Sequence, residues 1–142
     1  MRLRACLLLF LLPACVAPAR NATDYEHKAV DTAEAVLSSV ETGSLLARLA
    51  PEQAFTPFVS VGLSDAEAGA ASARAVFLSL QPPDARSDGV RAQLSPLLNR
   101  SDDALSRARI SARRGDLGAL TRSADKLSAT ATSLERFIAR FG

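Results

Sequence analysis

The chain has 142 residues, of which 48% are apolar, and its 17 basic residues nearly balance its 15 acidic ones. This length holds a single domain, and the balanced charge provides no overall positive field that would attract nucleic acid. Both cysteines lie in the first 15 residues, which excludes a disulfide framework, and one histidine is too few for a zinc or di-iron centre. We therefore expect no metal, no other cofactor and no nucleic-acid partner.

An export signal is the first element that the sequence predicts, over residues 1–19. Arg2 and Arg4 supply its positive charge, and an apolar run from Ala5 to Leu12 follows. Eight helical residues cover about 12 Å, whereas the hydrocarbon core of a membrane is about 30 Å thick, so this run is too short to span it. Residues 20–142 contain no longer apolar run and are expected to form one domain.

Two cleavage sites are open within this signal. The string Leu12-Pro13-Ala14-Cys15 resembles the lipobox of bacterial lipoproteins, although Pro13 departs from the small or hydroxylated residue usual there. The resemblance implies cleavage before Cys15 and acylation of its thiol, which would anchor the chain on the outer face of the cytoplasmic membrane. The alternative is signal-peptidase cleavage after Ala19, which would release an extracellular chain without a cysteine.

The first helix is expected to begin at Thr23, which forms a capping-box pattern with Glu26. Its apolar positions recur at steps of three and four residues. They are Val30, Ala33, Leu37 and Val40, widened by Ala29 and Val36. Gly43 interrupts this stripe, and the leucines at 45, 46 and 49 resume it out of phase. The helix is therefore expected to bend or to restart at Gly43 and to stop before Pro51.

A packed connection is expected from Pro51 to Leu63, because this segment is apolar without a clean period. Ser64 and Glu67 repeat the capping box and predict the start of the second helix. The stripe of that helix consists of Ala66, Ala70, Ala73, Phe77 and Leu80. Two consecutive prolines, at 82 and 83, end it.

The third helix is expected to be capped by Ser87 and to run to the residue before Gly115. Its stripe consists of Val90, Leu94, Leu97, Ser101, Leu105, Ala108 and Ala112. Pro96 lies inside this helix, where it removes a backbone hydrogen bond, so we expect a kink or a new start near Ser95. Gly115 suits the left-handed position after a helix, and Asp116 can cap the next helix at once.

The fourth helix has the most regular pattern in the chain, with alternating steps of three and four residues. The positions are Leu117, Leu120, Ala124, Leu127, Ala131, Leu134, Ile138 and Phe141. Each of the four segments has one apolar face that water penalises unless the faces meet. The sequence therefore predicts an all-α fold, an up-down four-helix bundle behind the export signal.

Charge is divided unevenly along the chain. Residues 15–73 hold eight acids against three bases, whereas residues 74–142 hold twelve bases against seven acids. Either the two halves pack together and neutralise each other, or the basic half faces anionic lipid or an acidic partner. The densest basic group, Arg107, Arg109, Arg113 and Arg114, lies in the last turns of the third helix, where cations complement the helix dipole.

Short motifs for catalysis or ligation are weak here. Asp24 and His27 have the spacing of half a di-iron motif, but the other half is missing. Ser123 with Lys126, and the triplet 87–89 (Ser-Asp-Gly), match fragments of the penicillin-recognising enzymes without their Lys-Thr-Gly element. Arg114-Gly115-Asp116 spells an integrin-attachment tripeptide, which the turn between two helices already explains. We therefore expect no catalytic residue.

Alanine at 27 positions, and 15 arginines against two lysines, are biases typical of a GC-rich bacterial genome. The strings at 24–29 (DYEHKA), 80–84 (LQPPD) and 109–116 (RISARRGD) resemble uncharacterised small exported, lipoprotein-like proteins of actinobacteria. The resemblance covers roughly residues 24–142 and implies an all-helical domain behind an export signal, with no catalytic residue to transfer.

The function expected from these patterns is that of a non-catalytic module anchored to the membrane through Cys15, which binds a protein or a cell-envelope ligand at the cell surface. The alternative is a freely secreted structural or inhibitory helical protein. A ligand site is expected near Pro96 or in the connection from Phe55 to Val61, because diverging helices leave space between them.

Overall fold

The computed structural model describes residues 19–50 and 56–142, which form four helices. They are α1 (Ala22–Leu49), α2 (Thr56–Ser79), α3 (Ala85–Arg114) and α4 (Leu117–Phe141). The described residues contain no strand, which confirms the all-helical prediction. Cys15 and Phe55 lie outside the described residues, and so does the predicted export signal except for Ala19.

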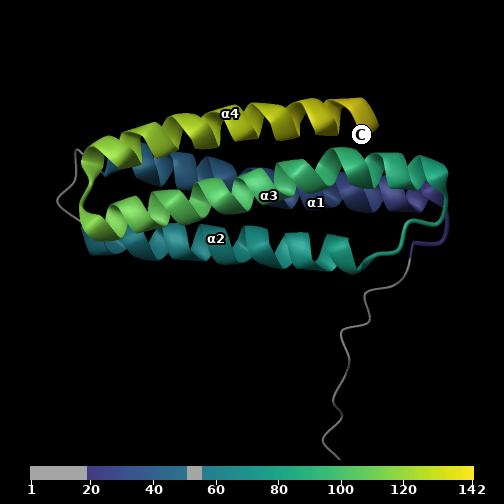
Figure 1. The fold of residues 1–142 in the computed structure, drawn as a ribbon, viewed down its shortest axis with the longest axis horizontal. Helices are drawn as coiled ribbons and strands as arrows, with labels where there is room; N and C mark the ends of the chain where they lie inside the picture. Colours follow the sequence, from purple (N-terminus) through teal and green to yellow (C-terminus); the bar gives the residue numbers. More distant parts are fainter. Residues whose placement is uncertain (1–18, 51–55) are drawn as a thin grey trace, which may run out of the picture.

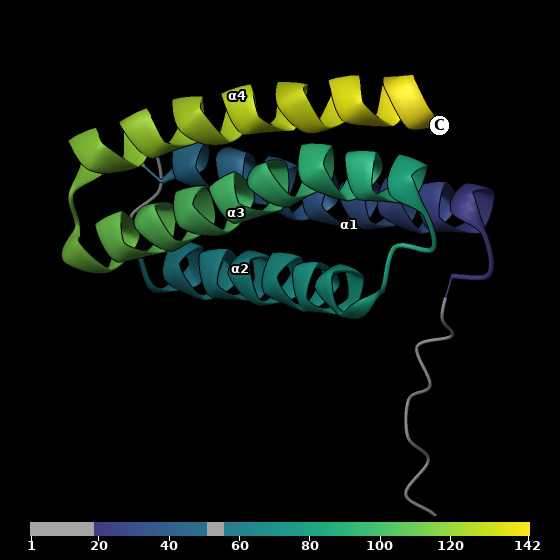
Figure 2. The ribbon, with the colours of Figure 1, turned by 45° about the vertical axis from the view of Figure 1, so that its right-hand side comes forward.

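Successive helices run in opposite directions, and α1 and α3 lie between α2 and α4 (Figures 1 and 2). Within the described part of the chain, α1 contacts all three other helices, and so does α3. In contrast, no Cα atom of α2 lies within 8 Å of one of α4, so these two backbones stay apart. The bundle therefore has a rhombic cross-section, with α1 and α3 on the short diagonal.

Three helix starts are capped by side-chain oxygens, and two of these caps differ from the predicted ones. The Asn21 side chain caps α1, not Thr23, and the Asp84 side chain caps α3, not Ser87, because in each case the earlier residue accepts the third backbone N–H of the helix. Gly115, with φ 65°, and Asp116, which accepts from the Ala119 N–H, form the turn before α4 as expected.

The cap at Asp84 makes stability depend on pH. A hydrogen bond from the backbone N–H of Ser87 lowers the pKa of this carboxyl below its usual value of 3.8. A lowered pKa in the folded state means that the cap stabilises fully above the unfolded pKa and is lost as pH falls through the folded one. We expect Asp84→Asn, which keeps the acceptor but cannot ionise, to flatten the fall in melting temperature below pH ~4. Parallel melting curves for the two proteins in acid would contradict this assignment.

The start of α2 corrects the prediction for residues 51–63. The helix begins at Thr56, eight residues before Ser64, and the Ser64 and Glu67 pair lies inside it. Val59 and Leu63 are buried and extend the stripe backwards at steps of four and three. Phe58 and Val61 beside them are exposed, and these two large apolar side chains obscured the period in the sequence.

Neither Gly43 nor Pro96 breaks its helix. α1 continues through Gly43, because the buried positions continue in phase through Gly43 and Ala47, while Leu45 and Leu49 are exposed. α3 continues through Pro96, so of the two alternatives predicted near Ser95, a kink or a new start, the new start is wrong. Pro96 has no N–H to donate to the carbonyl oxygen of Ala92. Both residues are exposed, so this carbonyl group faces solvent and can bond to water instead.

The core runs the length of the bundle and is built mostly from the predicted stripes. Every predicted stripe position of α3 is buried. In α4 the stripe shifts at both ends, since Leu117 is exposed and Phe137, rather than Phe141, is buried. Near the middle, a Cβ atom on Gly43 would lie 2.5 Å from Leu105 and 3.6 Å from Leu63 and Leu127, so all four helices approach one another at this glycine. At one end, the rings of Tyr25 and Phe77 pack 5.5 Å apart.

Candidate functional site

Three depressions lie along the surface between α3 and α4, and Glu26 of α1 also lines the third of them. The depression nearest the turn between the two helices has a volume of about 270 Å³, the middle one about 370 Å³ and the one at the far end about 400 Å³. Arg107 and Lys126 line both the first and the middle depression, one from each helix. We call this surface the α3–α4 groove.

Seven cations line the α3–α4 groove, against two acids. The cations are Arg86, Arg100, Arg107, Arg114, Arg122, Lys126 and Arg140, and the acids are Glu26 and Asp103. The cations of α3 lie at intervals of seven residues or multiples of seven, which places them in one column along the helix. From Arg86 to Arg114 this column extends about 42 Å, at 1.5 Å per residue.

Most of these cations have no ionic partner in the described part of the chain. Arg86 is the exception, since it donates to both carboxylate oxygens of Glu26 at 2.7 and 3.0 Å. The Arg100 Nε donates to the carbonyl oxygen of Pro96, and Arg140 lies over the ring of Phe141. Arg107 and Lys126 are exposed and form no ion pair with any described residue.

Elsewhere the acidic and basic halves of the chain do neutralise each other. Two ion pairs match a base of the basic half with an acid of the acidic half: Arg86 with Glu26, and Arg109 with Glu67. Arg48 and Asp125 also join the halves, but with the signs reversed. Glu67 also raises the pKa of the Arg109 guanidinium. The two halves therefore neutralise each other in part, and several of the cations that form no ion pair with a described residue line the α3–α4 groove.

The dense basic group predicted at the end of α3 is not one site. Arg109 faces α2 and pairs with Glu67, whereas Arg107 and Arg114 line the α3–α4 groove. Arg100, Arg122 and Lys126 belong to the same surface but were not predicted to. The interval of seven residues between Arg100, Arg107 and Arg114 was a signal that could have found Arg100.

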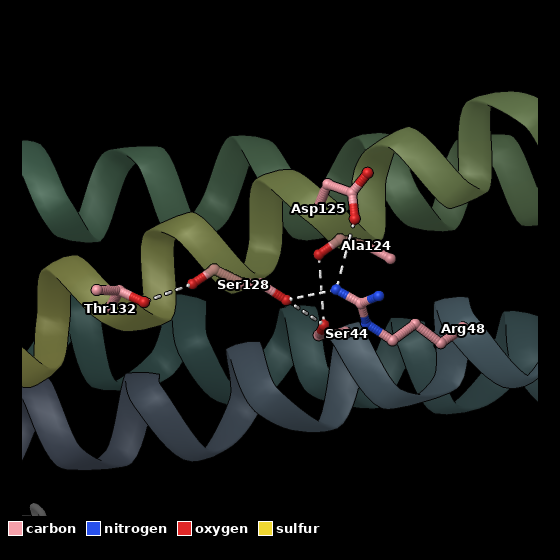
Figure 3. A network of polar contacts seen from close by, with 6 residues as sticks. All are labelled: Ser44, Arg48, Ala124, Asp125, Ser128 and Thr132. Carbon is pink, nitrogen blue, oxygen red and sulfur yellow. Dashed lines mark hydrogen bonds and ion pairs between the residues drawn. The ribbon is translucent and has the colours of Figure 1, made fainter.

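A second groove, between α1 and α4, contains a network of polar contacts (Figure 3). The hydroxyl of Ser44 lies 3.0 Å from that of Ser128 and donates to the carbonyl oxygen of Ala124. Arg48 donates to Ser128 at 2.9 Å and pairs with Asp125 at 3.5 Å. These contacts join α1 to α4, and Arg48 has a partner there that the cations of the α3–α4 groove lack.

The end of the bundle near Tyr25 is closed by packing and by Arg91. The guanidinium of Arg91 donates to the carbonyl oxygens of Leu78 and Leu80 and thereby caps the end of α2. Burial raises the pKa of the Tyr25 hydroxyl, an effect that the positive charge of Arg91 opposes. The hydroxyls of Tyr25 and Ser87 are buried without a hydrogen-bond partner among the described residues.

The catalytic and ligating motifs examined in the sequence are not brought together. His27 is exposed, and the side chain of Asp24 accepts from the Arg20 backbone and pairs with Lys28. The hydroxyl of Ser123 donates to the carbonyl oxygen of Ala119. The Ser-Asp-Gly triplet begins at Ser87 in the first turn of α3, whereas Ser123 lies in the second turn of α4, and these two helices begin at opposite ends of the bundle (Figure 1).

The regions expected to hold a ligand site do not form the groove. Pro96 lines none of the three depressions, and the described part of the Phe55–Val61 segment is the first turn and a half of α2. Over residues 19–50 and 56–142, no cluster of three or more His, Cys, Asp or Glu side chains could hold a metal ion. None of the four helices combines the length and the apolar character that crossing a membrane requires.

Comparison with known proteins adds no relative, since no protein-family model, no curated protein and no solved structure matches the chain.

Proposed function

We propose that the chain is an exported, non-catalytic helical module, anchored to the outer face of the cytoplasmic membrane through acyl chains on Cys15, that binds an anionic partner at the cell surface. The unneutralised cations of the α3–α4 groove carry the binding part of this proposal. A row of exposed cations raises the local concentration of anions and speeds their association. The resemblance to small exported proteins of actinobacteria supports the same cellular location.

Cleavage before Cys15 is favoured over cleavage after Ala19, because the folded domain already includes Ala19. Ala19 packs against the core, and the backbone N–H of Arg20 donates to Asp24 at 2.9 Å. Cleavage before Cys15 keeps the Ala19 contact, whereas cleavage after Ala19 removes it. Two or three acyl chains, at about 0.8 kcal/mol per buried methylene, suffice for a stable anchor.

Replacing Cys15 with Ser is expected to release the protein from the membrane or to block its maturation, because serine offers no thiol for acylation. Cell fractionation and intact mass measure this outcome, with Cys6→Ser as a matched control that leaves the lipobox-like string unchanged. Unchanged membrane retention and mass in the Cys15 variant would refute the anchor. Protein found in the culture supernatant without acyl mass would instead favour the alternative, a freely secreted structural or inhibitory protein.

The binding part is tested separately on the purified protein. A polyanion that binds the native state raises the melting temperature by mass action. Polyglutamate and inorganic polyphosphate, each added at low salt, are suitable probes because both carry dense negative charge. If neither raises the melting temperature, the proposed binding of an anionic partner is wrong.

A further inference from the structure

We infer that the α3–α4 groove binds an extended polyanion whose charges are phosphate groups. The inference rests on the proposed function, since it names the ligand class of the same groove. Four observations carry it: the unneutralised charge, its spacing, the hydrogen-bonding capacity of the groove and the residues that line it.

The centre of the groove places like charges on its two walls. Arg107 on α3 and Lys126 on α4 line the same two depressions, and no acid of the described chain pairs with either. Like charges at such positions repel, and the repulsion is weak only while water separates them. An anion bound between Arg107 and Lys126 replaces this repulsion with two attractive contacts. The ligand thereby gives each cation the ionic partner that it lacks in the free protein.

The spacing of the cations fits a long ligand rather than a compact one. Arg100, Arg107 and Arg114 follow one another at intervals of seven residues, which is about 10 Å per interval and about 21 Å in total. A single small anion can reach only one of these intervals. A linear polyanion lying along the groove can contact all three arginines together with the cations of α4.

The groove offers donors almost entirely from charged groups. Ser123, Thr130 and Ser133 each donate their hydroxyl hydrogen to a carbonyl oxygen of their own helix. A suitable ligand therefore consists of acceptors that match guanidinium and ammonium groups. Phosphate fits better than carboxylate, because its tetrahedral oxygens point out of a single plane and can accept from both walls at once.

The lining of the groove argues against base recognition. Proteins that hold single strands combine cations with aromatic rings on which bases stack. No aromatic residue lines the two depressions around Arg107, and Phe141 lies only at the far end. The groove is therefore suited to phosphate groups without attached bases.

The first experiment measures binding of inorganic polyphosphate to the purified chain by calorimetry over a range of salt concentrations. Arg107→Gln combined with Lys126→Gln is expected to weaken binding at least about tenfold and to reduce the slope of log affinity against log salt by about 2, one for each cation removed. The matched control is Arg113→Gln with Arg136→Gln, which removes two exposed cations that line none of the three depressions. Equal weakening in both double variants would mean that only net charge matters and would overturn the inference.

A charge reversal separates loss of binding from loss of folding. Lys126→Glu places a carboxylate opposite Arg107 and four residues after Arg122, so we expect a melting temperature equal to or above that of the unaltered protein together with loss of polyphosphate binding. Polyphosphate binding that survives in this variant, while the protein remains folded, would place the ligand elsewhere and overturn the inference.

Three competing ligands test the chemical class. Polyglutamate that binds as tightly as polyphosphate would overturn the assignment of phosphate while leaving the proposed binding of an anionic partner intact. Oligothymidylate that binds more tightly than polyphosphate would indicate base recognition, and groove-dependent binding to phosphatidylglycerol vesicles in preference to polyphosphate would indicate a membrane surface. Either of these two results would also overturn the inference.

Discussion

Replacing Gly43 with leucine is expected to lower the free energy of unfolding by about 3 kcal/mol, the upper part of the range for overpacked cores. A Cβ atom at this position would lie 2.5 Å from Cδ2 of Leu105, which is fully buried, and 3.6 Å from Leu63 and Leu127. Because side chains from three other helices meet there, no direction is free for a four-carbon side chain. Urea denaturation followed by circular dichroism measures the loss as a lower midpoint.

Gly89 provides the matched control for this effect. It also lies inside a helix, but a Cβ atom built on it meets nothing within 4 Å. Gly89→Ala is expected to stabilise the protein by up to about 1 kcal/mol, since alanine loses less backbone entropy in a helix. If Gly43→Leu left the urea midpoint unchanged, the close approach of the four helices at Gly43 would be refuted.

A second large effect is expected for Phe77→Ala, which should destabilise the fold by about 3–5 kcal/mol. Phe77 is fully buried and packs against Tyr25, so removal of its ring leaves a cavity that neighbouring helices cannot fill. Such a loss is a large part of the 5–15 kcal/mol that stabilises a typical domain. Thermal unfolding followed by near-ultraviolet circular dichroism would report both the loss and the changed surroundings of Tyr25.

The same substitution at Phe58 is the control, because Phe58 lies on α2 as well but is 69% exposed. Its replacement by alanine is expected to change stability by no more than about 0.5 kcal/mol. Similar losses for the two phenylalanines would show that the burial pattern of α2 is wrong.

The sequence predicted the fold correctly where the spacing of the apolar residues agrees with the residues that begin and end a helix. The stripe of α3 and the turn at Gly115 and Asp116 are confirmed, because only glycine adopts a φ of 65° there without strain and the aspartate caps α4 directly. The start of α2 was predicted too late, since exposed Phe58 and Val61 stand between the buried positions. Tertiary packing, rather than local pattern, decides which of several apolar residues is buried.

The candidate site was less accessible to sequence reasoning. Basic residues are densest along the sequence between Arg107 and Arg114, which suggested one site there. Arg109, however, forms an ion pair with Glu67 of another helix. The groove consists of residues that recur at intervals of seven on α3 and that meet α4 only after the chain reverses at Gly115. Which cations remain unneutralised depends on the positions of acids on α1 and α2, and a linear sequence does not show these distances.

The separation of the α2 and α4 backbones has a consequence for how the bundle opens. Within the described residues, the backbone of each of these outer helices approaches only α1 and α3. We therefore expect either one to detach for a moment while the other three helices stay together, so that opening can proceed in two parts rather than all at once. A molecule that bridges α3 and α4 would act on one of these openings alone, slowing the departure of α4 and leaving that of α2 unchanged.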